Sequence, residues 1–233
     1  MQNSSSWRVA SATAVATAAV IGWDLSSLDM TAARWFGGPE GFPLQDHWFF
    51  VHVLHDAVRL IAWLAVLLLC LGVWFPAGWL ERLPFRRRLQ LAVSTLSAVL
   101  LVHFTKSLSH SSCPWNLADF GGIAQYVSHW STLVRTDGGS GGCFPAGHAS
   151  AGFAFVGGYF AFREDAPGLA RRWLALALLV GLGVGLSQQM RGAHFMSHTL
   201  WSGWLCWCSA WAIDALMGRF ALDRVSADFG EAA

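Results

Sequence analysis

Charged residues are scarce in this chain of 233 residues, where they make up 12% of the sequence, against about 25% in soluble domains. Because 55% of the residues are hydrophobic, this composition excludes an intrinsically disordered chain, which combines low hydrophobicity with high charge. The two signs also nearly cancel, leaving a formal net charge of +1. No field from the whole protein would gather nucleic acid, so any charge-based function is local.

Lysine is almost missing, since 14 of the 15 basic residues are arginine and only Lys106 is a lysine. A signal-peptide cleavage site is also missing: WDLSSLD, and not an A-x-A-like sequence, follows the first apolar run. We therefore expect a retained N-terminal helix. No repeat of a solenoid or propeller period is present, and we expect a single membrane domain over residues 1–233.

Long apolar runs dominate the rest of the sequence. A helix needs roughly 20 mainly apolar residues to cross the hydrocarbon core of a bilayer, and six stretches come near that length. They are residues 9–25, 57–76, 89–106, 148–163, 172–190 and 194–217. The sequence therefore predicts an all-α fold, a polytopic membrane bundle of six transmembrane helices.

The distribution of arginine predicts the orientation of this bundle. If the N-terminus is cytoplasmic, ten of the fifteen basic residues flank the inner helix ends, as the positive-inside rule favours. We expect a bacterial inner membrane protein with both termini in the cytoplasm. Two long segments, residues 26–56 and 107–147, then face the periplasm, where long connections often carry function. The glycine-rich residues 138–142 are expected to be flexible.

Three polar clusters interrupt the apolar pattern, and the predicted topology places all of them on the outer side. They begin at Lys106, at Pro145 and at Ser187. Ionisable groups close to a membrane interior are costly and are usually functional. A lysine, an arginine and the free N–H groups of a helix N-terminus suit a phosphate. Two histidines among them, His148 and His194, indicate a nucleophile and an acid.

The order and spacing of these clusters resemble the type 2 phosphatidic acid phosphatase superfamily, which includes vanadium-dependent haloperoxidases. The signature of that superfamily reads KxxxxxxRP, PSGH and SRxxxxxHxxxD. Here the three parts read KSLSHSSCP from Lys106, PAGH from Pro145 and SQQMRGAHFMSH from Ser187. The resemblance covers about residues 89–217, so we expect a metal-independent phosphatase with its active site on the periplasmic side.

The resemblance implies a role for each matching residue. His194 would attack phosphorus to form a phosphohistidine, and His148 would protonate the leaving alkoxide and then activate water. Lys106 and the backbone of Ala146 and Gly147 would hold the phosphate oxygens. No metal and no other cofactor is implied.

The partner implied by the resemblance is a lipid phosphate, with phosphatidic acid, phosphatidylglycerol phosphate, undecaprenyl pyrophosphate and the phosphates of lipid A as candidates. A lipid phosphotransferase that uses the same intermediate is an alternative. An inactive relative that binds or transports lipids is another, because four positions of the signature differ here. Cys113 and Gln188 replace arginines, Ala146 replaces the serine, and His198 replaces the aspartate.

Other residues are candidates to compensate for these differences. Arg191 would restore one positive charge to the phosphate site beside Gln188, and Arg135 or His110 would supply another. His198, one helical turn beyond His194, would take the place of the orienting carboxylate as a third catalytic residue. The carboxylates of Asp24 and Asp56 are alternatives for that role.

Cysteines and further histidines complete the candidates. Cys113 and Cys143 share the second outer segment, so an oxidising compartment predicts a disulfide between them. A reactive thiolate at Cys113 and a metal bound by His194 and His198 at i, i+4 spacing are the alternatives. The HDAVR sequence from His55 to Arg59 is a candidate substrate contact, or else a set of residues at the membrane interface.

Overall fold

The computed structural model describes residues 2–230, and their regular structure is helical apart from two isolated bridges. The long helices are α1 (Gln2–Leu25), α3 (Val58–Leu71), α4 (Phe85–Ser107), α7 (Pro167–Met190) and α8 (Met196–Gly230). Shorter elements are α2 (Leu28–Arg34), the π-helix η1 (Phe49–Ala57), the 3₁₀-helix η2 (Gly78–Arg82), and α5 (Ser150–Phe153) and α6 (Gly157–Phe162), which η6 (Ala154–Val156) joins. The prediction of an all-α fold is confirmed.

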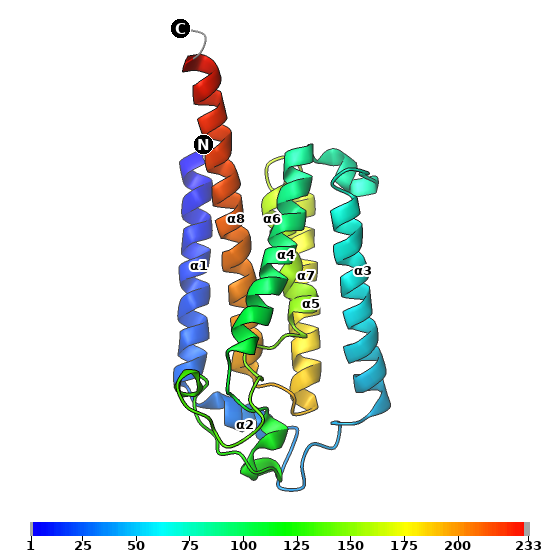
Figure 1. Cartoon of the computed structure of the whole chain (residues 1–233), viewed down its shortest axis with the longest axis vertical. Helices are drawn as coiled ribbons and strands as arrows, with labels where there is room; N and C mark the ends of the chain where they lie inside the picture. The colour runs from blue at the N-terminus through cyan, green and yellow to red at the C-terminus, as the bar shows by residue number, and fades with distance from the viewer. Residues whose placement is uncertain (1, 231–233) are drawn as a thin grey trace.

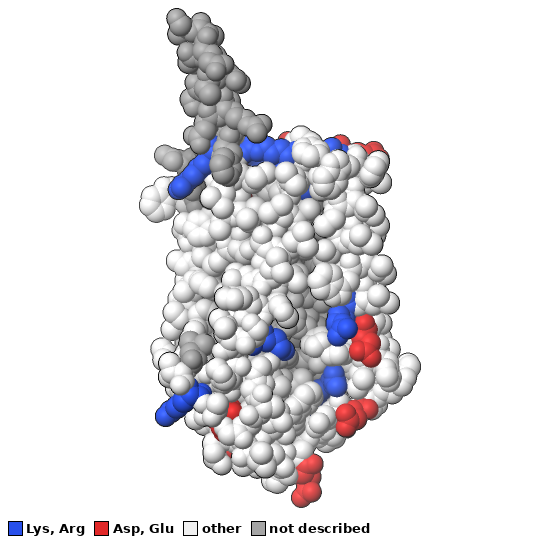
Figure 2. Space-filling model, in the orientation of Figure 1, with Lys and Arg blue, Asp and Glu red and all other residues white. Residues whose placement is uncertain are grey.

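Several of these helices are long and apolar enough to cross a membrane. Within the described chain they are Phe49–Leu71, Phe85–Ser107 and Pro167–Met190, and the α1–α2 pair, bent by 71°, makes a fourth if it counts as one span. Ser150–Phe162 is a shorter apolar helix. Figure 2 shows a broad uncharged band between the two ends of the visible face. These features indicate a membrane protein.

The helices alternate in direction, and this alternation determines where the three motif segments lie. The last turns of α4 and α7 and the first turns of α5 and α8 are at the same end of the bundle, next to the connection between α4 and α5 (Figure 1). Lys106 is in the last turn of α4, and His148 and His194 directly precede α5 and α8. Residues that are far apart in the sequence are therefore brought to one end.

Small residues allow the helices at this end to approach closely. A Cβ atom on Gly181 of α7 would collide with the ring of Phe153 in α5, and one on Gly185 would collide with Thr199 in α8. One face of α7 therefore packs against two different neighbours through two glycines one turn apart. Such small-residue contacts are how transmembrane helices pack without a hydrophobic driving force.

An ionic cluster ties the helices together at the opposite end. Asp214 of α8 accepts hydrogen bonds from Gln90 Nε2 at 2.9 Å and from Arg163 Nη2 at 2.8 Å. Arg87 Nη1 lies 3.4 Å from the same carboxylate, and its Nη2 pairs with Glu164. Two arginines and two carboxylates therefore neutralise one another between α4, the end of α6 and α8.

The bend between α1 and α2 brings a carboxylate to the start of α8. Ser27, at the bend, has a φ of 58°. Two residues later, Asp29 accepts hydrogen bonds from the backbone N–H of Ser197 at 3.0 Å, from the Ser197 hydroxyl and from Trp23 Nε1 at 2.7 Å. A buried carboxylate thus caps the first turn of α8, where the helix leaves backbone N–H groups unsatisfied. It holds the segment that carries His194.

Candidate active site

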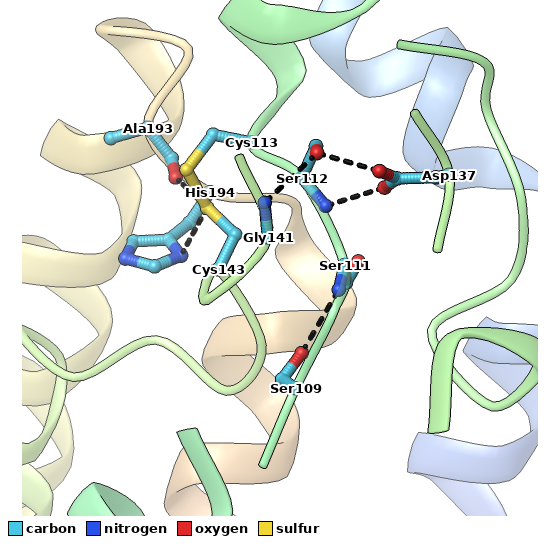
Figure 3. Close-up of a disulfide and its surroundings, with 9 residues drawn as sticks. All are labelled: Ser109, Ser111, Ser112, Cys113, Asp137, Gly141, Cys143, Ala193 and His194. Atoms are coloured by element: carbon cyan, nitrogen blue, oxygen red, sulfur yellow. Dashed lines mark hydrogen bonds between the residues drawn. A yellow bond between two sulfur atoms is a disulfide. The ribbon is translucent and has the colours of Figure 1, made fainter. Parts of the chain in front are cut away.

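A disulfide joins two of the motif segments. Cys113 and Cys143 are bonded, with their Cα atoms 5.2 Å apart and 30 residues between them in sequence (Figure 3). The disulfide prediction is confirmed, and Cys70, Cys206 and Cys208 are free. On the loop-entropy model such a crosslink contributes about 3–4 kcal/mol. The bond leaves Cys113 without a thiolate, which argues against its role as a nucleophile.

The glycine-rich part of this segment is held in place, in contrast to the flexibility expected from its composition. Asp137 accepts hydrogen bonds from the Ser112 N–H at 2.6 Å and the Ser112 hydroxyl at 2.7 Å, and also from the Gly139 N–H at 3.0 Å. The Ser112 hydroxyl in turn accepts from the Gly141 N–H at 3.3 Å (Figure 3). The positive φ angles at Gly138, Gly141 and Gly142 therefore serve a defined turn that anchors Cys143.

A cavity of about 300 Å³ lies beside the motif residues. Its polar lining consists of His55, Arg59, His103, Lys106, Gly147, His148 and Ser150, and no carboxylate is among the described residues that line it. The rest of the lining is apolar and comes mainly from η1, α3, α4 and α5. In Figure 2, basic side chains lie around a hollow in the visible face near this end of the bundle. The cavity therefore suits an anionic group attached to an apolar one.

His148 forms part of the cavity wall and stacks on a residue from η1. The ring centroids of His148 and His55 are 3.8 Å apart, and His55 Nδ1 lies 2.8 Å from Asp56 Oδ1. Burial lowers the pKa of His148 to about 3, and the positive charges of His55, Lys106 and Arg59 act in the same direction. A pKa this low leaves the ring neutral at neutral pH.

His194 lies behind this wall and is 4% exposed. Its Nδ1 faces the sulfur of Cys143 at 3.7 Å, so the second ring nitrogen, Nε2, points away from the disulfide (Figure 3). Burial lowers the pKa of His194 well below its usual range, with the charges of Lys106, His198 and His148 as further causes. His194 is thus an uncharged imidazole near the ammonium group of Lys106, and a neutral ring is the state that a nucleophile requires.

The sulfur of Cys143 also touches the carbonyl oxygen of Ala193 at 2.9 Å. A disulfide sulfur carries no proton, so this is a close packing contact and not a hydrogen bond. Together with the contact to His194, it places the disulfide directly against the Ala193–His194 segment. The crosslink therefore supports the candidate nucleophile as well as closing a loop.

No hydrogen bond joins His194 to His198 within the described residues. The His194 and His198 rings have centroids 5.8 Å apart, and the Nδ1 atom of His198 is buried without a hydrogen-bond partner among the described residues. Asp24 accepts hydrogen bonds from the indoles of Trp130 and Trp201. Asp56 faces the histidines of η1. Neither carboxylate hydrogen-bonds to His194 in the described structure.

His129 is a further buried polar residue, and it lies next to His198. His129 meets His198 edge to face, with centroids 5.7 Å apart, and its Nε2 lies 3.4 Å from Asp24 Oδ2. Burial lowers the pKa of His129, and the carboxylate of Asp24 opposes that effect. Sequence analysis missed His129, because nothing in its spacing relates it to the three motif segments.

The turn before α5 offers backbone donors to the cavity. The N–H of Ala146 donates to the carbonyl of His198 at 3.1 Å, so this donor is already used. The N–H groups of Gly147 and His148 make no backbone hydrogen bond within the described residues. A Cβ atom on Gly147 would lie 3.7 Å from Lys106 Nζ, so the ammonium group sits against this turn. Lysine and free N–H groups together can hold an anion.

Arg191 and Gln188 interact with each other, and neither is among the described residues that line the cavity. Arg191 Nη1 donates to Gln188 Oε1 at 3.2 Å, and its Nε donates to the carbonyl of Gln45 at 2.9 Å. The guanidinium also lies over the ring of Trp115, 5.9 Å from its centroid. These contacts orient Arg191 without neutralising it. Neither Arg135 nor His110 is among the residues that line the cavity.

Three cavity residues lie outside the motif positions. His55 and Arg59 are the ends of the HDAVR sequence, which the structure brings to the cavity, and His103 lies one turn before Lys106 in α4. The i, i+3 spacing of His103 from Lys106 was a usable signal, since residues three apart share a helix face. Asp29 and Asp137, which position the site, carried no such signal.

The metal alternative can be tested against the donor atoms. Cys143, His194 and His198 each offer one atom, all within 4.8 Å of one another. The sulfur of Cys143 is bonded to Cys113 and offers no thiolate, so two imidazoles remain. Zinc sites in proteins use at least three protein ligands. These residues therefore do not fit a zinc site.

Comparison with known proteins agrees with this geometry. No curated protein and no solved structure matches the chain. The sequence profile of the PAP2 superfamily matches residues 87–220. This range includes nearly all of α4, the disulfide-linked connection between α4 and α5, α5 to α7, and the first part of α8. This match covers more than half of the chain and contains all three motif segments. The protein therefore belongs to the PAP2 superfamily, whose members are generally phosphatases.

Proposed function

We propose that this protein is an integral membrane phosphatase that removes a phosphate from a membrane lipid through a phosphohistidine at His194. The observation that carries the proposal is a cavity lined by Lys106 and His148, with no carboxylate among the described residues of its lining, and a buried, neutral His194 close enough to both for their charges to lower its pKa. Unpaired positive charge at such a cavity is complementary to a phosphate dianion. Membership of the PAP2 superfamily supports the same chemistry.

The proposed reaction has two steps. His194 Nε2 attacks phosphorus, the bond between phosphorus and the ester oxygen breaks, and His148 donates a proton to the leaving alkoxide. His148 then takes a proton from water, which attacks the phosphohistidine and releases inorganic phosphate and neutral His194. Lys106, Arg191, Gln188 and the free N–H groups of Gly147 and His148 hold the phosphate oxygens in both steps.

We further propose six membrane spans, with the shorter helix Ser150–Phe162 and the first part of α8 as the fourth and sixth. The site faces the periplasm of a bacterial inner membrane, and both termini are cytoplasmic. The disulfide at the site end supports this orientation, because disulfides persist in oxidising compartments. The arginines at the other end, which include Arg87, Arg163 and Arg171, support it through the positive-inside rule.

The test is phosphate release by purified protein in detergent, with EDTA present throughout. The substrates are phosphatidic acid, phosphatidylglycerol phosphate, undecaprenyl pyrophosphate and lipid A. We expect release from at least one lipid, loss of release in His194→Ala, and a phosphorylated protein on acid-free trapping of the wild type. His47→Ala is the matched control, because His47 is exposed and outside the cavity.

Each alternative predicts a different outcome of the same assay. Release that appears only when an acceptor lipid is added would make the protein a phosphotransferase. Equal release by the wild type and His194→Ala would overturn the assignment of the nucleophile. No release and no transfer from any lipid would favour an inactive relative, which the four altered signature positions allow.

A further inference from the structure

A second cavity adjoins the cationic one and is lined by apolar residues alone. Its volume is about 290 Å³, and it shares Val58, Ala62, Ala151 and Phe155 with the first cavity. The remaining lining comes from α3, α7 and Trp79 of η2. The two cavities therefore form one groove with a cationic end and an apolar end.

The apolar end lies against α3, which belongs to the least buried of three candidate membrane spans. Only 6% of the apolar window of Phe49–Leu71 is buried, against 39% for Phe85–Ser107 and 28% for Pro167–Met190. α3 lies at the edge of the bundle in Figure 1. The groove therefore runs along the least buried of these three spans, and under the proposed function bilayer lipid is the neighbouring medium.

The depth of the groove matches a lipid tail. Val184 lines the cationic cavity and Trp173 the apolar one, and both belong to α7. Eleven residues of helix separate them, which is about 16 Å at 1.5 Å per residue. This depth is close to half of the roughly 30 Å hydrocarbon core, the part that one leaflet fills.

Two tryptophans close the deep end. The Trp79 and Trp173 rings meet edge to face with centroids 6.2 Å apart. Trp173 is fixed by a hydrogen bond from its Nε1 to the carbonyl of Phe155 at 2.7 Å. Trp79, in contrast, is 61% exposed. Trp173 is therefore fixed within the bundle, whereas Trp79 is largely exposed.

We propose that the apolar cavity holds the tail of the lipid phosphate and that the Trp79–Trp173 pair limits the length of tail it accepts. An occupant that fills both cavities at once needs an anionic end and an apolar chain, which excludes a helix or a second copy of this protein. The proposal rests on the proposed function, and it names tail length as the property of the substrate that the protein selects.

The experiment uses single-chain alkyl phosphates of increasing length in mixed micelles, with glycerol phosphate as the member without a tail. The readout is kcat/KM for each chain length relative to glycerol phosphate. Ala65 lines only the apolar cavity, so Ala65→Trp fills it and should lower the relative value for long chains more than about tenfold, since each buried methylene contributes about fourfold. Trp79→Ala opens the deep end and should move the preferred length towards longer chains.

Leu64→Trp is the matched control, because Leu64 is next to Ala65 on α3 but is 50% exposed and outside both cavities. It should leave the length profile as in the wild type. An unchanged profile in both Ala65→Trp and Trp79→Ala, with wild-type hydrolysis intact, overturns the proposal. A profile that Leu64→Trp changes as much as Ala65→Trp also overturns it.

A binding measurement separates this proposal from the proposed function. Native mass spectrometry of His194→Ala with a long alkyl phosphate reports retained lipid without turnover. Loss of retention on adding Ala65→Trp supports the groove even if the wild type releases no phosphate, a result that would refute only the phosphatase reaction. Equal retention with and without Ala65→Trp refutes the groove.

Discussion

The two ends of the bundle both concentrate charged side chains, but the arginines between the helices at one end are paired, whereas two basic residues that line the cavity at the other end are not paired within the described residues. At the end near α6, Arg87 and Arg163 share the carboxylate of Asp214, and Glu164 completes the cluster. At the other end, Lys106 and Arg59 face the cavity and form no salt bridge within the described chain. Paired charges serve to hold helices together, whereas unpaired positive charge beside a cavity is retained for an anionic ligand.

The largest effect is expected at a proposed catalytic residue in the cavity that has unpaired basic side chains. His148→Gln should lower the release of phosphate from a lipid about 10³-fold, because general acid catalysis contributes about 10²–10⁴-fold. p-Nitrophenyl phosphate should be affected less, since its leaving group needs no proton. Steady-state kinetics on both substrates measures this difference. His103→Gln, in the same cavity, is the control, and an equal loss on the two substrates would contradict the assignment of His148 as the acid.

At the paired end we expect a loss of stability and not of chemistry. Asp214→Asn leaves two arginines without their shared carboxylate, and breaking a buried pair in this way costs about 3–5 kcal/mol. The midpoint of thermal unfolding in detergent should fall, while kcat/KM of the protein that stays folded should not change. Asp119→Asn is the control, because its pair with Arg34 is exposed and should contribute less than about 1 kcal/mol. A fall in kcat/KM without a fall in the unfolding midpoint would contradict the structural role of Asp214.

Replacing one basic residue by methionine at each end tests whether unpaired charge serves activity and paired charge serves stability. Lys106→Met removes an unpaired charge, so phosphate release should fall about 100-fold while the unfolding midpoint stays unchanged or rises. Arg87→Met removes a paired charge and should lower the midpoint, because Asp214 loses one partner. Midpoints and kcat/KM are measured for both variants. If Lys106→Met were the less stable of the two, the charge of Lys106 would be structural.

The smallest effect is a pH dependence of stability that the site end alone should show. The pKa of His148 is about 3 in the folded protein, below its ordinary value of 6.5, and that of His194 is also lowered. Between these two values the unfolded chain binds more protons than the folded one, so stability is full above pH 6.5 and falls as the pH drops towards 3. Unfolding midpoints at about pH 7.5 and about pH 5 measure the slope.

His148→Gln should reduce this slope by the contribution of one group, because glutamine does not titrate, while His194 still contributes. His47→Gln should not, since His47 is exposed. An identical slope in the wild type and His148→Gln would show that the neutral state of His148 has no influence on folding. The comparison between the two ends would then rest on Asp214 and Lys106 alone.

Periodicity and spacing predicted much of this molecule because both act locally. Apolar runs identified the helices, and their alternation along the chain predicted that Lys106, His148 and His194 meet at one end. Figure 1 shows the corresponding ends of α4, α5, α7 and α8 at the same end of the bundle. The disulfide was predictable because Cys113 and Cys143 share one outer segment. The start of the second predicted span was placed too late, at residue 57, because the π-helix of η1 extends it back to Phe49.

Contacts between distant segments were not predictable in the same way. Nothing in the sequence pairs Asp29 with Ser197, Asp137 with Ser112 or His55 with His148. Each of these contacts depends on how two elements pack, and a single sequence contains no record of that packing. The glycine-rich stretch shows the same limit, because its composition indicates flexibility but does not reveal the hydrogen bond from Gly139 to Asp137.

The sequence by itself determined the helical class, the membrane character, the superfamily and the identity of the candidate reactive histidines, since these follow from local composition and from spacing within short segments. Only the tertiary structure decided that the cavity is cationic and free of lining carboxylates, that Ala146 already uses its N–H, and that an apolar groove continues to Trp79 and Trp173. The physical reason is that charge pairing, burial and cavities are properties of the space between helices, which no single segment encloses.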